Sequence, residues 1–197
     1  MKKTTFLLLI LFAIECKAQL FKFQSGVGYA IVTGNDFKKI SLAKQVMIGS
    51  EFILKEFLYI DLMAGITTLQ YSRDNANTEN YFKKQYASLA ACLKKYYPLS
   101  KKSSFFWEVG PAFNYDFKVL QEIYTNADHT NISQKNLGST LSLNGNAGFK
   151  TQMLRNVFFD VTLYTQTDFF TFYSKTANKT KTNRQLLSFT LYFKLKK

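Results

Sequence analysis

Cysteine, proline and histidine are scarce in this sequence, and the scarcity excludes whole classes of structure. Among 197 residues there are two cysteines, two prolines and one histidine. One histidine and two cysteines cannot form a convincing zinc cluster, which needs several such ligands at close spacing. A dense disulfide framework is excluded as well. We therefore expect no metal site and no cofactor.

Long apolar runs are also missing, apart from one near the start of the chain. The run "FLLLILFAI" at residues 6–14 is shorter than the ~18 residues of a transmembrane helix. It follows Lys2 and Lys3 and precedes small residues at Cys16 and Ala18, which is the layout of a secretory signal. We expect residues 1–18 to be removed and residues 19–197 to form one domain. The rival interpretation is a lipoprotein acylated at Cys16, but Glu15 stands where a small residue is needed.

Acidic residues are few relative to basic ones. The chain has 26 lysines and arginines against 13 acids, a formal net charge of +13. Removing Lys2, Lys3, Lys17 and Glu15 with the expected signal leaves +11 and a single cysteine, Cys92. Such an excess indicates anionic partners, among which nucleic acid is the least compatible with export. The alternative is that scattered lysines only keep loops soluble.

What the sequence does have is alternation of apolar and polar residues, the period of a β-strand. Breaker residues divide it into eight segments, and few helical elements are expected. The segments are residues 20–33, 40–54, 57–71, 82–97, 105–119, 137–151, 157–170 and 184–195. Several exceed the ~9 to 11 residues with which a tilted strand crosses a bilayer.

Short and long connections alternate along the chain. The links "LKEF", "PLSKKSS" and "QMLRN" are short, whereas "YSRDNANTENY", "LQEIYTNADHTNISQKN" and "TFYSKTANKTKTNRQ" are long, with "TGNDFKK" a modest exception. Transmembrane barrels have short periplasmic turns and long outer loops. The pattern predicts an all-β fold, an eight-stranded antiparallel up-and-down transmembrane β-barrel in the outer membrane.

The two faces of each segment support a barrel with a polar interior. In "SFFWEVGPAFNYDFKV", residues 104–119, Phe105, Trp107, Val109 and Phe113 share a face opposite Glu108 and Asp116. The polar faces are rich in Gly, Ser, Thr, Asn and Gln, which suits a crowded closed interior. Residues 82–97 have no clean phase, and we place Leu89, Ala91 and Leu93 outward and Ser88, Ala90, Cys92 and Lys94 inward.

The inward charges are nearly balanced, so we expect them to pair across the lumen. Glu108 is expected to pair with Lys94 or Lys150. Lys22 and Lys118 are further inward charges. The predicted lumen polar network consists of Glu51, Asp61, Lys94, Glu108, Asp116, Lys150, Asp160 and Lys194.

One stretch resembles a known family. In "YASLAACLKKYYPLSKKSSFFWEVGPAFNY", a Tyr-initiated apolar strand ends in Lys-Tyr, a short basic turn follows, and the next strand carries Gly-Pro before aromatics. This resembles the PorT-like outer-membrane β-barrel family of Bacteroidetes-type bacteria. The chain departs from the family in lacking a proline in "SLAACL" and in ending with lysines. The resemblance implies the barrel fold and a place in the cell envelope, but it says little about function.

His129 is the one candidate for catalysis. It lies in "NADHTNIS" near Asp128 and Ser133, and barrel enzymes that modify lipids resemble such an arrangement. General-base catalysis requires a histidine held by a second group against a nucleophile, which a loop rarely provides. We therefore interpret His129 as a solvated loop residue and expect no catalytic residues.

The preferred function is a small non-enzymatic outer-membrane barrel with a plugged lumen, whose surface loops interact or support an envelope complex. Its expected partners are outer-membrane lipid and lipopolysaccharide, the barrel-assembly machinery and other envelope proteins. The alternatives are a barrel enzyme that modifies lipid A or phospholipid, and a soluble exported ligand binder of lipocalin type.

Overall fold

A computed structural model describes residues 20–33, 38–75, 78–125, 129–134, 138–173 and 181–194. These residues form nine strands, and no helix among them is long and apolar enough to cross a membrane. The strands are β1 (Leu20–Thr33), β2 (Lys38–Lys55), β3 (Leu58–Asn75), β4 (Thr78–Pro98), β5 (Ser103–Thr125), β6 (His129–Gln134), β7 (Gly138–Leu154), β8 (Val157–Tyr173) and β9 (Lys181–Lys194).

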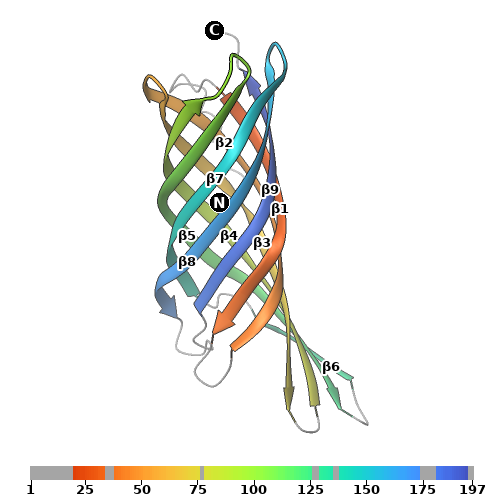
Figure 1. The fold of residues 1–197 in the computed structure, drawn as a ribbon. Helices are drawn as coiled ribbons and strands as arrows, with labels where there is room; N and C mark the ends of the chain where they lie inside the picture. Colours follow the sequence, from red (N-terminus) through yellow and green to blue (C-terminus); the bar gives the residue numbers. More distant parts are fainter. Residues whose placement is uncertain are drawn as a thin grey trace.

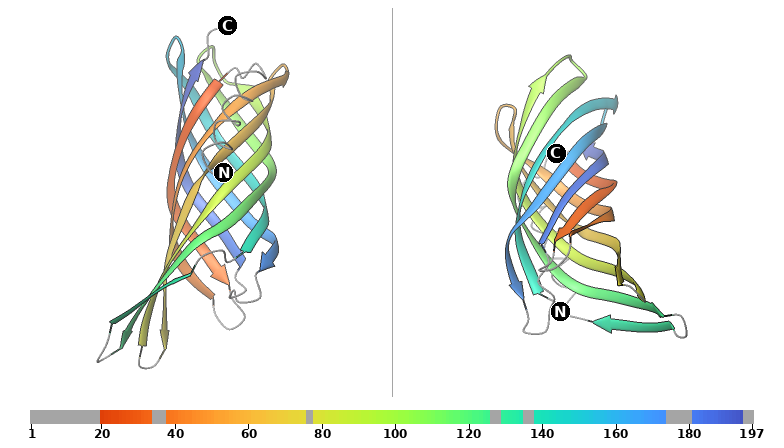
Figure 2. Two further views of the ribbon diagram at one scale, coloured as in Figure 1. Left: turned by 180° about the vertical axis from the view of Figure 1, so that it is seen from behind. Right: turned by 60° about the horizontal axis from the view of Figure 1, so that its bottom comes forward.

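Eight of the nine strands close into a ring of antiparallel neighbours (Figures 1 and 2). β1 pairs with both β2 and β9, and β4 pairs with β5, so these eight strands leave no free edge. β5 pairs with β7 over its first part and with the short β6 over its second part. The predicted eight-stranded up-and-down barrel is confirmed.

The short connections lie together at one end of the barrel, which we call the short-turn end (Figure 1). Two-residue turns join β2 to β3 at Glu56 and Phe57, and β7 to β8 at Arg155 and Asn156. β1 begins and β9 ends at this same end, because Leu20 lies opposite Lys194. The three short links expected from the sequence are therefore all turns on one side.

All three of the expected long links contain strand, and two of them extend beyond the barrel. Pairing of β3 with β4 continues to Asn75 and Thr78, and β5 extends to Thr125 and pairs with β6. These parts of β3, β4, β5 and β6 form a ribbon that projects beyond the barrel at the other end (Figures 1 and 2). Polar residues had indicated loops, but antiparallel ladders can continue in water because their backbone groups pair with each other.

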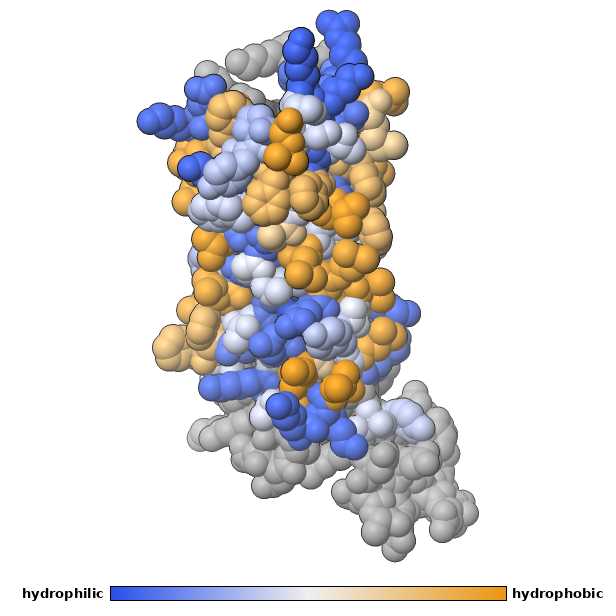
Figure 3. Space-filling view, viewed as in Figure 1, coloured by the Kyte–Doolittle hydropathy of each residue, from blue (hydrophilic) through white to orange (hydrophobic). Residues whose placement is uncertain are grey.

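Alternation along the strands turns apolar side chains outward. In β9 every second residue from Thr182 to Tyr192 is buried, while Leu187, Phe189 and Leu191 between them are exposed. The same inversion runs around the ring, and apolar residues gather over the barrel wall (Figure 3). In β4 the buried and outward sets follow the expected phase, with Ser88, Ala90, Cys92 and Lys94 buried. This polarity is opposite to that of a soluble lipocalin-type barrel, whose outer face meets water.

Glycines on the inner face allow the narrow ring to curve. A Cβ atom added at Gly110 would lie 2.6 Å from Cys92 Cα, and one at Gly28 would lie 2.8 Å from Leu186 Cα. No side chain fits at such a separation from a neighbouring backbone. Gly28 is therefore a point of close approach between β1 and β9, which is one of the roles that glycine has inside a strand.

Candidate functional site

The half of the lumen nearer the short-turn end contains a cluster of paired charges centred on Glu51. This carboxylate, on β2, receives Lys94 Nζ of β4 at 2.8 Å and Lys150 Nζ of β7 at 3.1 Å. The hydroxyl of Tyr96 also donates to it, at 2.8 and 3.0 Å. Glu51 is fully buried. Two cations and a hydroxyl thus offset the cost of burying one carboxylate.

Further pairs extend this cluster across the barrel. Lys94 Nζ lies 3.5 Å from Glu108 Oε2, and Asn146 donates a hydrogen bond to the same carboxylate. Lys22 pairs with Asp61. Of the two partners expected for Glu108, Lys94 is the one in contact, because Lys150 reaches Glu51 instead.

Aromatic rings fill the space around the two central lysines. Lys94 Nζ lies 3.8 Å from the centroid of Phe106, and Lys150 Nζ lies 3.6 Å from that of Tyr192. The Tyr192 hydroxyl accepts from Lys94 Nζ at 2.8 Å and donates to Asp160. Cation–π contacts of this kind are stronger where water is excluded. The rings therefore support the ion pairs and occupy the bore.

A second cluster lies toward the other end of the lumen. Lys84 pairs with Asp116 at 2.8 Å, and Arg184 lies 3.7 Å from Asp168 and over the ring of Tyr86. Asp168 also receives the hydroxyl of Ser142 at 2.7 Å. On β2 to β5 an apolar patch separates this cluster from the Glu51 cluster, formed by Met47, Met63, Ala90, Cys92 and Ala112.

The structure buries seven of the eight residues of the predicted lumen network and brings them into these two clusters. The buried residues are Glu51, Asp61, Lys94, Glu108, Asp116, Lys150 and Asp160. Lys194, in contrast, is exposed at the end of β9 and makes no ion pair with a described residue. The side chain of Lys118 lies outside the described residues.

Sequence reasoning missed Lys84, Asp168 and Arg184 as members of the network, although all three are buried. Lys84 falls in the segment without a clean phase. Asp168 lies next to a register shift between β7 and β8. Ser142 pairs with Asp168, but the preceding residue, Leu141, pairs with Phe170, so Phe169 has no partner in the register. Arg184 stands at the margin of its expected segment. The alternation of β9 was the one signal that could have indicated an inward Arg184, because Arg184 is in phase with Leu186 and Ser188.

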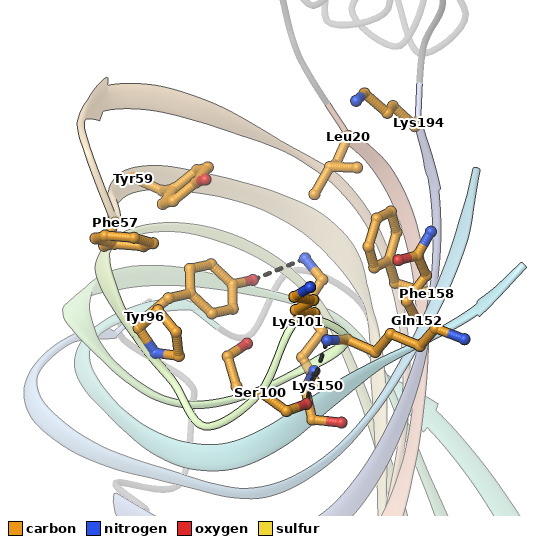
Figure 4. Close-up of a pocket in the computed structure, with 14 residues that line it drawn as sticks. Leu20, Phe57, Tyr59, Tyr96, Ser100, Lys101, Lys150, Gln152, Phe158 and Lys194 are labelled. Carbon is orange, nitrogen blue, oxygen red and sulfur yellow. Dashed lines mark hydrogen bonds between the residues drawn. The ribbon is translucent and has the colours of Figure 1, made fainter. Parts of the chain in front are cut away.

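A pocket opens at the short-turn end of the barrel, above the Glu51 cluster (Figure 4). Its volume is about 290 Å³. Phe57 and Tyr59 lie on one side and Phe158 on the other, while the hydroxyl of Tyr96 meets Lys150 between them. The lining residues are Leu20, Phe57, Tyr59, Tyr96, Pro98, Ser100, Lys101, Lys102, Ser103, Ser104, Lys150, Gln152, Phe158 and Lys194.

For His129, the candidate catalytic residue, the structure describes the backbone but not the side chain. His129 is the first residue of β6 and lies opposite Tyr124 of β5 in the ribbon, so it belongs to a strand and not to a loop as expected. Asp128 lies outside the described residues. Within the described part of the chain, no group of three or more His, Cys, Asp or Glu side chains could hold a metal ion.

Comparisons with known proteins identify the fold. No protein-family model matches the chain, and no curated protein sequence does. Neisserial surface protein A (NspA) superimposes with a TM-score of 0.54 at 11% identity, covering 89% of this chain and 97% of that one. The outer membrane protein OprG from Pseudomonas aeruginosa matches with a TM-score of 0.48 at 12% identity, covering 91% and 98%. Ail of Yersinia pestis matches with a TM-score of 0.46 at 15% identity, covering 89% of this chain and 99% of that one.

The polarity of the barrel agrees with this likeness. Its wall carries exposed Phe, Leu, Ile and Val side chains, whereas its interior is polar, ion-paired and closed by strand pairing. A closed barrel satisfies every backbone group internally, as a membrane-spanning structure must. The chain is therefore an outer-membrane β-barrel, in which eight antiparallel strands present an apolar face to lipid and enclose a charged lumen.

Proposed function

We propose that this chain is a small non-enzymatic outer-membrane barrel that acts through its surfaces, as a contact or support for other envelope proteins. The filled lumen carries the proposal. Its largest fully buried side chains include Arg184, Tyr164, Tyr192, Lys22 and Lys94. An eight-stranded ring is just wide enough for side chains or one small ligand, and here buried side chains contact one another across the bore. A lumen plugged in this way leaves the ends of the barrel for function.

We place the short-turn end in the periplasm and the ribbon outside the cell, because transmembrane barrels have short periplasmic turns. The ribbon of β3 to β6 would then extend an outer surface toward partners. The periplasmic end would present a basic turn at residues 99–102, which contains Lys101 and Lys102. Outer-membrane lipid and lipopolysaccharide would surround the wall, after insertion by the barrel-assembly machinery.

Membership of the PorT-like family is part of the proposal. The stretch that carries the resemblance covers the second half of β4, the basic turn and the first half of β5. It contributes Lys94, Tyr96 and Glu108 to the Glu51 cluster and Lys101 and Lys102 to the pocket. These contacts give the resembling residues a structural role at the periplasmic end of the barrel.

Planar-bilayer recordings of the purified protein test the plugged lumen, with a general porin as the positive control. We expect no steady conductance of porin size. Such a conductance at neutral pH would refute the plug. His129→Ala protein in a lipid A deacylation or acyl-transfer assay tests the enzyme alternative, which a histidine-dependent product would establish.

Site-specific photo-crosslinking in intact cells tests the surface role. A photoreactive residue replaces Thr130 on the ribbon or Ser100 in the periplasmic turn, and Leu187 on the lipid-facing wall serves as the control. We expect a discrete protein adduct from at least one end and none from Leu187. If both ends give no adduct, the proposed contact role is wrong.

A further inference from the structure

The charged residues that line the pocket at the short-turn end are all positive. Four of its lining residues are lysines, namely Lys101, Lys102, Lys150 and Lys194, and no lining residue is acidic. The charge of Lys150 is offset by Glu51 below it. The other three lysines make no ion pair with any residue in the described part of the chain. Within the described part of the chain, the rim of the pocket therefore carries positive charge that no paired acid offsets.

Aromatic side chains form the walls. Tyr59 and Tyr96 meet edge to face with ring centroids 5.1 Å apart, and Phe57 and Phe158 are the other two aromatic residues of the lining. Tyr96 is buried, and its hydroxyl is held by Glu51 and by Lys150 at 2.8 Å. The position of its ring is thus set by the ion-pair cluster beneath, so this wall exists before any ligand arrives.

The turn beside the pocket is held in an unfavourable backbone conformation. Phe57 has a φ of 60°, in the left-handed region that non-glycine residues rarely adopt. Its carbonyl oxygen accepts a hydrogen bond from the Tyr96 amide at 2.8 Å, which ties the β2–β3 turn to β4. A positive φ is what a two-residue hairpin turn requires, so this conformation follows from the turn itself. The turn and its hydrogen bond to β4 fix Phe57 in the lining of the pocket.

We propose that this pocket binds a small organic anion, in which one carboxylate or phosphate is attached to an apolar ring or chain. The lysine rim matches the anionic group, and the aromatic walls match the apolar part. A volume of about 290 Å³ accommodates a ligand of the size of a single amino acid derivative. The ligand could reach the pocket free in the periplasm or as the terminal carboxylate of a peptide. This inference goes beyond the proposed contact role and can fail independently of it.

Isothermal titration of the protein in lipid nanodiscs tests the proposal. The probes are N-acetylphenylalanine, which is anionic, and its neutral amide, which has the same ring. We expect the anion to bind about tenfold more tightly than the amide at low salt, and its affinity to fall as salt screens the lysines. Phenyl phosphate tests the phosphate form, and acetyl-Ala-Ala-Phe tests the peptide source. Equal affinity for acid and amide, or no binding of any anion, would overturn the proposal.

Matched variants localise the binding. Lys101→Gln combined with Lys102→Gln removes two rim charges and should weaken anion binding about tenfold. Lys55→Gln is the control, because Lys55 is exposed near the neighbouring β2–β3 turn but does not line the pocket. Heat-dependent gel mobility verifies that each variant is folded. An equal loss in Lys55→Gln, or unchanged affinity in the double variant, would show that the pocket is not the site.

Discussion

Glu51 is the residue on which the lumen most depends, because two buried lysines share its carboxylate. Without it, Lys94 would retain Glu108 at 3.5 Å, but Lys150 would lose its one ion pair among the described residues. Breaking a buried pair costs more than the pair contributes, since an uncompensated charge stays buried. Single substitutions in this cluster should therefore have effects well above those of surface changes.

Glu51→Gln should destabilise the barrel by about 3 to 5 kcal/mol, because two buried cations then face a neutral amide. Glu108→Gln should cost less, since Lys94 keeps Glu51. Glu56→Gln, in an exposed turn, should stay within about 0.5 kcal/mol. Equilibrium unfolding in denaturant, with protein folded into liposomes, measures all three. A Glu51 variant as stable as the Glu56 variant would contradict the cluster's role.

Val109 tests the outer face in the same assay. Its side chain points away from the lumen on β5, between the buried Glu108 and Gly110. Val109→Arg should cost about 2 to 4 kcal/mol, because a charge near mid-depth meets hydrocarbon. Glu56→Arg, in the exposed β2–β3 turn, should be tolerated. If the arginine at 109 is tolerated too, that face does not meet lipid.

At the scale of elements, the strands differ in how well the sequence predicted them. β9 alternates cleanly and lies close to its expected bounds. β4 has no clean phase, yet its inward set is as expected, because its pairing with β3 and β5 sets which face turns inward. The extension of β5 and the existence of β6 were missed. Both belong to the ribbon, where they join the outer parts of β3 and β4 and where backbone pairing continues beyond the end of the hydrophobic alternation.

Removal of the ribbon should leave the barrel intact. A variant in which short turns replace residues 73–80 and 120–134 loses the outer parts of β3, β4 and β5 together with β6. Both charge clusters lie within the closed ring, so unfolding free energy should change by less than about 1 kcal/mol. The heat-dependent gel shift and denaturant midpoint check this. Failure to form a heat-modifiable barrel would mean that the ribbon is needed to close it.

At the scale of the whole molecule, the barrel is a closed ring of strands around a lumen lined with buried side chains. Cys92 is 2% exposed and lies in the apolar patch between the two charge clusters. It is the only cysteine expected after signal removal, and it is a free thiol. Its accessibility therefore reports on whether water and small solutes reach the middle of the lumen.

In protein that begins at Gln19, Cys92 should resist a small alkylating reagent while folded and react fully once unfolded. Ser100→Cys, in the exposed turn between β4 and β5, should react in both states and serves as the positive control. Mass spectrometry distinguishes the two sites. Rapid labelling of Cys92 in the folded barrel would indicate an open lumen and would argue against the plug.

The sequence by itself determined the eight barrel strands, the lipid-facing side of those that alternate cleanly, and which of their connections are short. These features depend on local patterns, because alternation has a period of two and short links permit only tight turns. Which charges pair, in contrast, was decided by the tertiary structure. Lys150 and Glu51 are 99 positions apart, and Lys94 and Tyr192 are 98 apart. Such contacts depend on strand register and on curvature of the closed ring, which no local pattern encodes.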